Sequence, residues 1–129
     1  MARYDKYDPI SGGFRAPLAA DWAGALATPV GVGLDANGRV VPGAGTSGVV
    51  GVVVIDGQVR SDGTRVNVKR AGDVVDVMTA GEIVDNAGLA AGTVYFADGT
   101  AGAIGTDATD ARVGHTVEAQ RLVVRFAAL

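Results

Sequence analysis

Residues 113–126 read VGHTVEAQRLVVRF, and this stretch decides the fold class. In its second half, the apolar residues Leu122, Val124 and Phe126 occupy every other position. A period of two places these three side chains on one face of a β-strand. The first half alternates in the same way, and the connection between the halves is short enough for a tight hairpin. The stretch therefore predicts two antiparallel strands with one buried face.

The spacing of glycine extends this prediction to the whole chain. There are 20 Gly in 129 residues, and only 1–11, 14–23 and 115–129 run ten or more residues without one. Each Gly in a helix interior costs about 1 kcal/mol relative to Ala, so long helices are disfavoured. Val-rich runs between Gly turns favour strands instead. We predict an all-β chain, a small β-barrel or β-sandwich of roughly eight to ten short strands.

Two further runs support this architecture. The run 49–55 is apolar on both faces of a strand. We expect a second layer or a neighbouring subunit to cover both faces. The dipeptide Asn37-Gly38 lies between the strand-like runs 30–34 and 39–41, and this arrangement predicts a second hairpin.

Length, charge and composition exclude several classes of protein. A chain of 129 residues favours a single domain, and its apolar content is too high for a disordered chain. Disulfides and zinc–thiolate sites are excluded because the sequence has no Cys. No apolar run approaches the ~20 residues of a membrane helix, and the first residues do not resemble a secretory signal. The net charge of −3 disfavours nucleic acid as the main partner.

The first 22 residues differ from the rest. They hold four of the seven aromatic residues and show no regular period. We predict an extended N-terminal arm over 1–28 and one β-rich domain over 29–129. Because the first strand pattern starts near Val30, deletion of 1–18 is predicted to leave that domain folded.

Aromatic residues and Arg are enriched at the energetic centres of protein interfaces. The arm therefore supplies the candidate interface residues, and Arg15 is expected to pair with an acidic group of a partner. An alternative stays open, in which the arm packs on its own domain and completes a core poor in large side chains. The candidate residues are Tyr4, Tyr7, Pro9, Phe14, Arg15 and Trp22.

No motif for catalysis or for a cofactor emerges. His115 is the single histidine, and we expect it on the apolar face of its strand, partly buried. Residues 43–48 match G-x-G-x-x-G, but a strand-like run follows where a nucleotide site needs a helix, so we expect a turn. No Ser lies in a G-x-S-x-G context. We predict neither an enzyme nor a metal, cofactor or small-molecule site.

The order of several short segments resembles that of capsid decoration (cement) proteins of tailed bacteriophages with high-GC hosts. The resemblance covers most of the chain and lies in Gly and Val patterns. It implies a structural virion protein on the outer surface of the mature head, and a homotrimer at three-fold or quasi-three-fold positions. The implied partner is the major capsid protein, without nucleic acid or membrane. The segments that carry it include YDP (7–9), GGFRAPL (12–18), VGVGL (30–34), VVGV (49–52), AGDVVDVM (71–78), GEIV (81–84), AGTVYF (91–96), VGHTVE (113–118) and LVVR (122–125).

Two functions from other classes remain as alternatives. One is a β-sandwich adhesion or receptor-binding module on a phage head or tail. Such a module would carry exposed aromatic residues on its body, whereas here they gather near the N-terminus. The other is a trimeric β-fold enzyme, against which the missing motifs argue.

Overall fold

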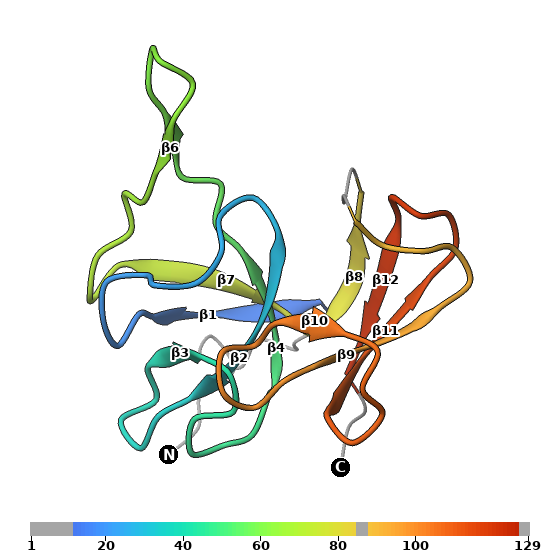
Figure 1. Cartoon of the computed structure of the whole chain (residues 1–129). Coiled ribbons are helices and arrows are strands. Elements are labelled where there is room, and N and C mark those ends of the chain that lie inside the picture. Colours follow the sequence, from blue (N-terminus) through green and yellow to red (C-terminus); the bar gives the residue numbers. More distant parts are fainter. Residues whose placement is uncertain (1–11, 85–87, 127–129) are drawn as a thin grey trace.

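The structure is a computed structural model, and it describes residues 12–84 and 88–126. Within these residues the chain forms strands, turns and loops, and none of them belongs to a helix long and apolar enough to cross a membrane. The all-β prediction is confirmed (Figure 1). The described strands are β1 (Gly13–Pro17), β2 (Pro29–Leu34), β3 (Val40–Pro42), β4 (Gly51–Val54), β5 (Gln58–Val59), β6 (Arg65–Val66), β7 (Val74–Met78), β8 (Ala80–Ile83), β9 (Val94–Ala97), β10 (Ile104–Gly105), β11 (Ala111–Thr116) and β12 (Leu122–Arg125).

Most of these strands belong to two five-stranded sheets that lie side by side (Figure 1). The first sheet has the order β1-β7-β4-β2-β3, and the second has the order β10-β9-β11-β12-β8. The two edge strands of the first sheet, β1 and β3, do not pair with each other. The chain next to β1 touches β3 at a single parallel bridge, between Leu18 and Val40, so the sheet is curled but does not form a closed barrel. Of the two predicted architectures, the molecule is therefore sandwich-like and not a closed barrel.

From Gly51 to Val53, strand β4 is covered on both faces, as its apolar sequence predicts, and only Val54 at its end is exposed. Val53 belongs to one buried cluster, with Trp22 and Val30, and Val52 belongs to a second cluster, with Leu122 and others. The cover comes from the same chain, because the second sheet packs against the Val52 face. The first cluster is Leu18, Trp22, Val30, Val32, Val40, Val53, Ile55, Val75 and Val77, and the second is Val52, Tyr95, Ala97, Val113, Leu122 and Val124.

The two sheets also meet backbone to backbone, at a glycine seam formed by Gly31, Gly43, Gly99 and Gly102. The Gly31 N–H donates to the Gly102 carbonyl (2.8 Å), and the Ala44 N–H, next to Gly43, donates to the Gly99 carbonyl (2.9 Å). A Cβ on Gly102 would run into the Gly31 carbonyl, and Gly102 has φ +75°. The halves can approach this closely only because side chains are absent.

Residues 43–48 form a turn, as predicted, and strand β4 follows it. The N–H of Leu34 donates to the Ser47 hydroxyl (2.9 Å), which ties the turn to the end of β2.

The second predicted hairpin, at Asn37-Gly38, is also confirmed. The Asp35 carboxylate accepts the N–H groups of Asn37 and Arg39, both at 2.9 Å, in the turn between β2 and β3.

The prediction that no regular element precedes Val30 is wrong. Strand β1 pairs with β7 from Gly13 opposite Met78 to Pro17 opposite Val74, and it forms an edge of the first sheet. The sequence pattern did not indicate β1 because the strand is short and ends in Pro, a residue that an edge strand tolerates. The predicted arm is therefore part of the sheet from Gly13 onward, and deletion of 1–18 would remove a strand.

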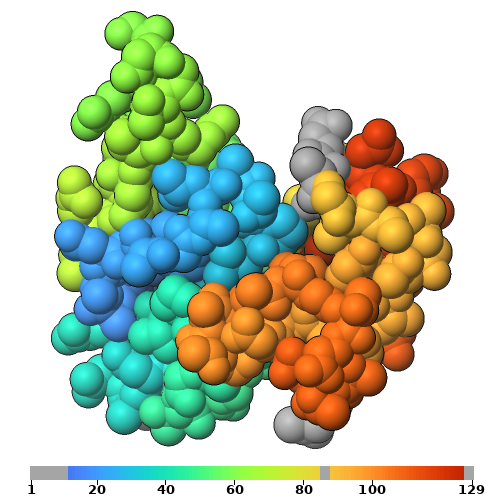
Figure 2. Space-filling view, viewed as in Figure 1, coloured from blue at the N-terminus to red at the C-terminus, as the bar shows by residue number. Residues whose placement is uncertain are grey.

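Strands β5 and β6 form a separate two-stranded ribbon outside both large sheets. In Figures 1 and 2 this ribbon, coloured green, projects from the first half of the molecule into solvent. Residues 57–69, which comprise the ribbon, its tip and its return, are called the finger below.

Candidate functional site

The structure separates the six candidate interface residues. Tyr4, Tyr7 and Pro9 lie outside the described residues. Phe14 and Arg15 lie on β1, with Phe14 partly buried and Arg15 exposed. Trp22 lies in the core.

Trp22 is only 4% exposed and packs in the first buried cluster. Its indole Nε1–H donates to the Ala25 carbonyl (3.1 Å), and its backbone N–H donates to the Lys69 carbonyl (3.1 Å). The side-chain amide of Asn67 donates to the Trp22 carbonyl. For Trp22, the alternative that the sequence left open therefore applies: it completes the chain's own core.

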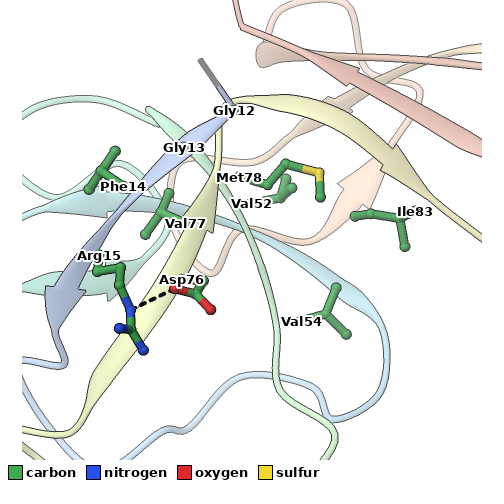
Figure 3. A pocket seen from close by; sticks show the side chains of 10 residues that line it. All are labelled: Gly12, Gly13, Phe14, Arg15, Val52, Val54, Asp76, Val77, Met78 and Ile83. Carbon is green, nitrogen blue, oxygen red and sulfur yellow. Dashed lines mark ion pairs between the residues drawn. The ribbon is translucent and has the colours of Figure 1, made fainter. Parts of the chain in front are cut away.

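An apolar groove lies beside β1, at the junction of the two sheets, and has a volume of about 440 Å³ (Figure 3). Its walls come from β1, β4, β7 and β8. The lining residues are Gly12, Gly13, Phe14, Arg15, Val52, Val54, Asp76, Val77, Met78 and Ile83. We name this surface the junction groove.

The junction groove exists because the second sheet covers only part of the first. Along β7, Val75 and Val77 point into the first buried cluster, so the residues between them face the other way. On that outer face, Met78 packs against the second cluster, but Val74 is 50% exposed. Val54, on the same face of β4, is 39% exposed. An apolar strip is thus left open beside the covered part of the face.

Arg15 spans the rim of the groove toward Asp76, which lies opposite it in the strand register. Its Nε lies 2.9 Å from Asp76 Oδ1 (Figure 3). Both side chains are largely exposed, so the pair contributes at most about 1 kcal/mol. The sequence predicted that Arg15 pairs with an acidic group of a partner, whereas in the structure it pairs with Asp76 of its own chain.

The groove continues along the sheet. A second hollow of about 200 Å³ shares Arg15, Val54 and Asp76 with it and extends to Val74 and Lys69. Together they form a furrow with exposed valines on its floor and the Arg15–Asp76 pair at its side. Such a furrow suits an extended segment that offers small apolar side chains.

The prediction that His115 lies on an apolar face is wrong. Arg112 pairs with Phe96 and Gly114 pairs with Tyr95, so Val113 is an extra residue that bulges from the ladder. A bulge shifts the alternation of all residues after it. His115 is therefore exposed and Thr116 is buried.

His115 instead borders a hollow of about 610 Å³, which Arg112 and Arg125 also line. Within the described residues, no group of three or more His, Asp or Glu is arranged to hold a metal ion.

The turn after β9 contains a carboxylate, that of Asp98, whose pKa is lowered. The Asp98 Oδ1 accepts the N–H groups of Ala101 (2.7 Å), Thr100 (2.8 Å) and Gly102 (3.2 Å). These bonds, those from Ala101 and Thr100 foremost, hold the pKa of Asp98 below its ordinary value. The negative charge thus helps to shape the loop that forms one side of the glycine seam.

This geometry predicts a pH-dependent effect of Asp98→Asn. Because the folded-state pKa is lowered, the stabilisation by this carboxylate is present above its unfolded pKa of about 4 and is lost as the pH falls below it. We expect the variant to unfold at a lower urea concentration than the parent at pH 7. The difference between the two urea midpoints should become smaller toward pH 3. Urea titrations at both pH values measure the two midpoints, and a difference that stays the same at both pH values would contradict the prediction.

Sequence reasoning missed the exposed valines of the junction groove. A usable pattern existed in the run DVVDVM (73–78), where apolar residues occupy both faces of one strand. Such a strand needs cover on both sides, or leaves one apolar side open. Which side stays open depends on how far the second sheet extends, and the local sequence does not encode that.

Comparisons with known proteins address the fold. No protein-family model and no curated protein matches the chain. Among solved structures, a chain from Mycobacterium phage Patience has a similar fold, with a TM-score of 0.79. The alignment covers 95% of each chain at 20% sequence identity. At this identity the likeness shows a shared fold.

Proposed function

We propose that this chain is a decoration protein of a tailed-phage capsid. In this proposal it is a structural virion protein that binds major capsid protein subunits on the outer surface of the mature head. It acts as a homotrimer at three-fold or quasi-three-fold positions. It carries no catalytic role and needs no cofactor, nucleic acid, membrane or small-molecule substrate.

The observation that carries the proposal is the fold shared with a phage protein over nearly the whole length of both chains. The segment order described for the sequence supports it independently. A decoration protein stabilises a head by mass action, because it binds the assembled shell and not the separated subunits. Many copies on one shell strengthen the effect.

The junction groove is the surface that we assign to the capsid protein. Val54 lines this groove and Val74 lines the adjoining hollow, and a monomer leaves both valines in water without benefit to its own core. The rim of the groove is β1, which carries two of the predicted interface residues, Phe14 and Arg15.

The test is co-sedimentation with mature heads that lack the protein. The parent chain is expected to pellet with heads, and Val54→Asp combined with Val74→Asp is expected to weaken attachment tenfold or more. Tenfold corresponds to only about 1.4 kcal/mol, which is less than the cost of placing two carboxylates in an apolar contact.

Val117→Asp is the matched control, since Val117 is similarly exposed, at 44%, but follows β11 of the second sheet. It should attach as the parent does. Failure of the parent chain to attach would contradict the decoration function. Equal attachment of the parent and the groove variant would contradict only the assignment of the groove. Binding to host cells instead of heads would favour the adhesion alternative.

A further inference from the structure

Within the described residues, the finger is held to the rest of the chain at its base, where Asn67 and Lys69 form hydrogen bonds with the Trp22 backbone, and its two strands project beyond this point. Its two strands pair only with each other, at Gln58 opposite Val66 and Val59 opposite Arg65. A lone two-stranded hairpin is at best marginally stable in water. Val59 is 54% exposed and Val68 is 45% exposed, and neither belongs to a buried cluster.

Hydrogen bonds nevertheless fix the backbone of the finger at its tip and at its base. At the tip, the Asp62 carboxylate accepts the N–H of Thr64 (2.9 Å), and the Arg60 N–H donates to the Thr64 carbonyl (2.8 Å). At the base, a guanidinium N–H of Arg65 donates to the Asp56 carbonyl (2.5 Å). A ribbon of defined shape that leaves Val59 and Val68 about half exposed is typical of an element that is completed by a partner.

The charge of the finger indicates the kind of partner. It holds Arg60, Arg65 and Lys69 against Asp62, a net charge of +2, so the remaining residues of this −3 chain carry −5. Within the described residues, neither Arg60 nor Lys69 takes part in an ion pair. A surface with small apolar side chains and carboxylates would complement the finger in both respects.

The chain itself offers such carboxylates, on the loops at the two ends of β10. Asp98, Asp107 and Asp110 form no ion pair within the described residues. Partial burial, followed by repulsion from Asp107 and Asp98, raises the pKa of Asp110 above its ordinary value. Added positive charge would relieve that repulsion. We name these three residues the acidic loops.

We propose that the finger of one copy docks on the acidic loops of the next copy of this chain. The contact is head-to-tail, because two different surfaces meet, and such contacts build closed rings when the rotation between copies closes. The inference rests on the proposed function in that it supplies the contact between subunits of the decoration trimer. The junction groove stays free for the capsid protein.

Disulfide trapping tests the contact without heads, and the natural chain contributes no thiol because it has no Cys. Val59→Cys and Asp107→Cys are placed on separate, differently tagged chains, which are mixed at high concentration and oxidised. The control replaces Asp107→Cys with Asn37→Cys, in the exposed turn between β2 and β3. We expect at least tenfold more mixed cross-link for the first pair, and equal amounts would overturn the proposal.

A charge exchange on the same pair tests the chemistry. Arg60→Glu added to the Val59→Cys chain, or Asp110→Lys added to the Asp107→Cys chain, should each lower the cross-link several-fold. Both changes together should restore it, because the signs are exchanged across the contact. Arg39→Glu, outside the finger, serves as the charge control and should leave the yield unchanged. Absence of restoration would overturn the proposed pairing.

Co-sedimentation separates this inference from the proposed function. If Arg60→Glu weakened attachment to heads but left the cross-link unchanged, the finger would contact the capsid protein, and the inference would be wrong while the function stood. If the parent chain failed to attach to heads while the cross-link formed, the function would be wrong and the contact between copies would stand.

Discussion

A chain that begins at Gly12 is expected to fold, and a chain that begins at Ala19 is expected not to. The second deletion removes β1 and Leu18, which is only 1% exposed in the first buried cluster. Loss of a buried Leu side chain alone costs about 2–5 kcal/mol. Loss of the β1–β7 pairing adds to this cost, and the sum approaches the total of about 5–15 kcal/mol that holds a typical domain folded.

Far-ultraviolet circular dichroism and urea unfolding of both truncated chains measure this. The chain from Gly12 should retain a cooperative transition close to that of the full chain. The chain from Ala19 should lack it. A cooperative transition in the shorter chain would show that β1 is dispensable, as the sequence alone suggested.

The second large effect is expected at the glycine seam. Gly102→Ala places a Cβ against the Gly31 carbonyl and forces a non-Gly residue to φ +75°. Backbone strain of this kind costs about 1–3 kcal/mol, and overpacking costs about 1–3 kcal/mol more. We expect the free energy of unfolding to fall by about 3 kcal/mol or more.

Two other glycines separate these causes. Gly92 has φ +62° and open space around it, so Gly92→Ala should report strain alone, about 1–2 kcal/mol. At Gly99, φ is not positive and the nearest atom, Ala44 Cβ, would lie 3.6 Å from a new Cβ, so Gly99→Ala should change stability by about 0.5 kcal/mol or less. Equal losses for Gly92→Ala and Gly102→Ala in urea unfolding would contradict the close approach of the sheets.

Local patterns predicted the elements whose partners are close in sequence. The hairpin of β11 and β12 and the turn at Asn37-Gly38 are both confirmed, because alternation and turn chemistry are local properties. The two-sided burial of β4 was also predicted from its composition. The bulge at Val113 could not be predicted from the local sequence, because it arises from the pairing of β11 with β9. This one extra residue places His115 on the exposed face.

The candidate site was predicted less completely. Composition singled out the N-terminal segment as unusual, but it could not divide the segment into a strand at 13–17, a core anchor at Trp22 and the residues before Gly12. That division depends on β7, which lies some sixty residues further along the chain. The junction groove depends on how far the second sheet extends over the first. That extent is set by the tertiary packing of the whole chain, so the local sequence does not predict it.

The glycine seam also provides internal reporters of how the two halves come apart. The amide protons of Gly31 and Ala44 are held by carbonyls of Gly102 and Gly99, across the seam. If the halves separate before either unfolds, these amides should exchange with deuterium faster than those inside β4 or β11. If the halves unfold as one unit, all should exchange at one rate, governed by global opening. Native-state hydrogen exchange would then show whether the sheets form one cooperative unit or two.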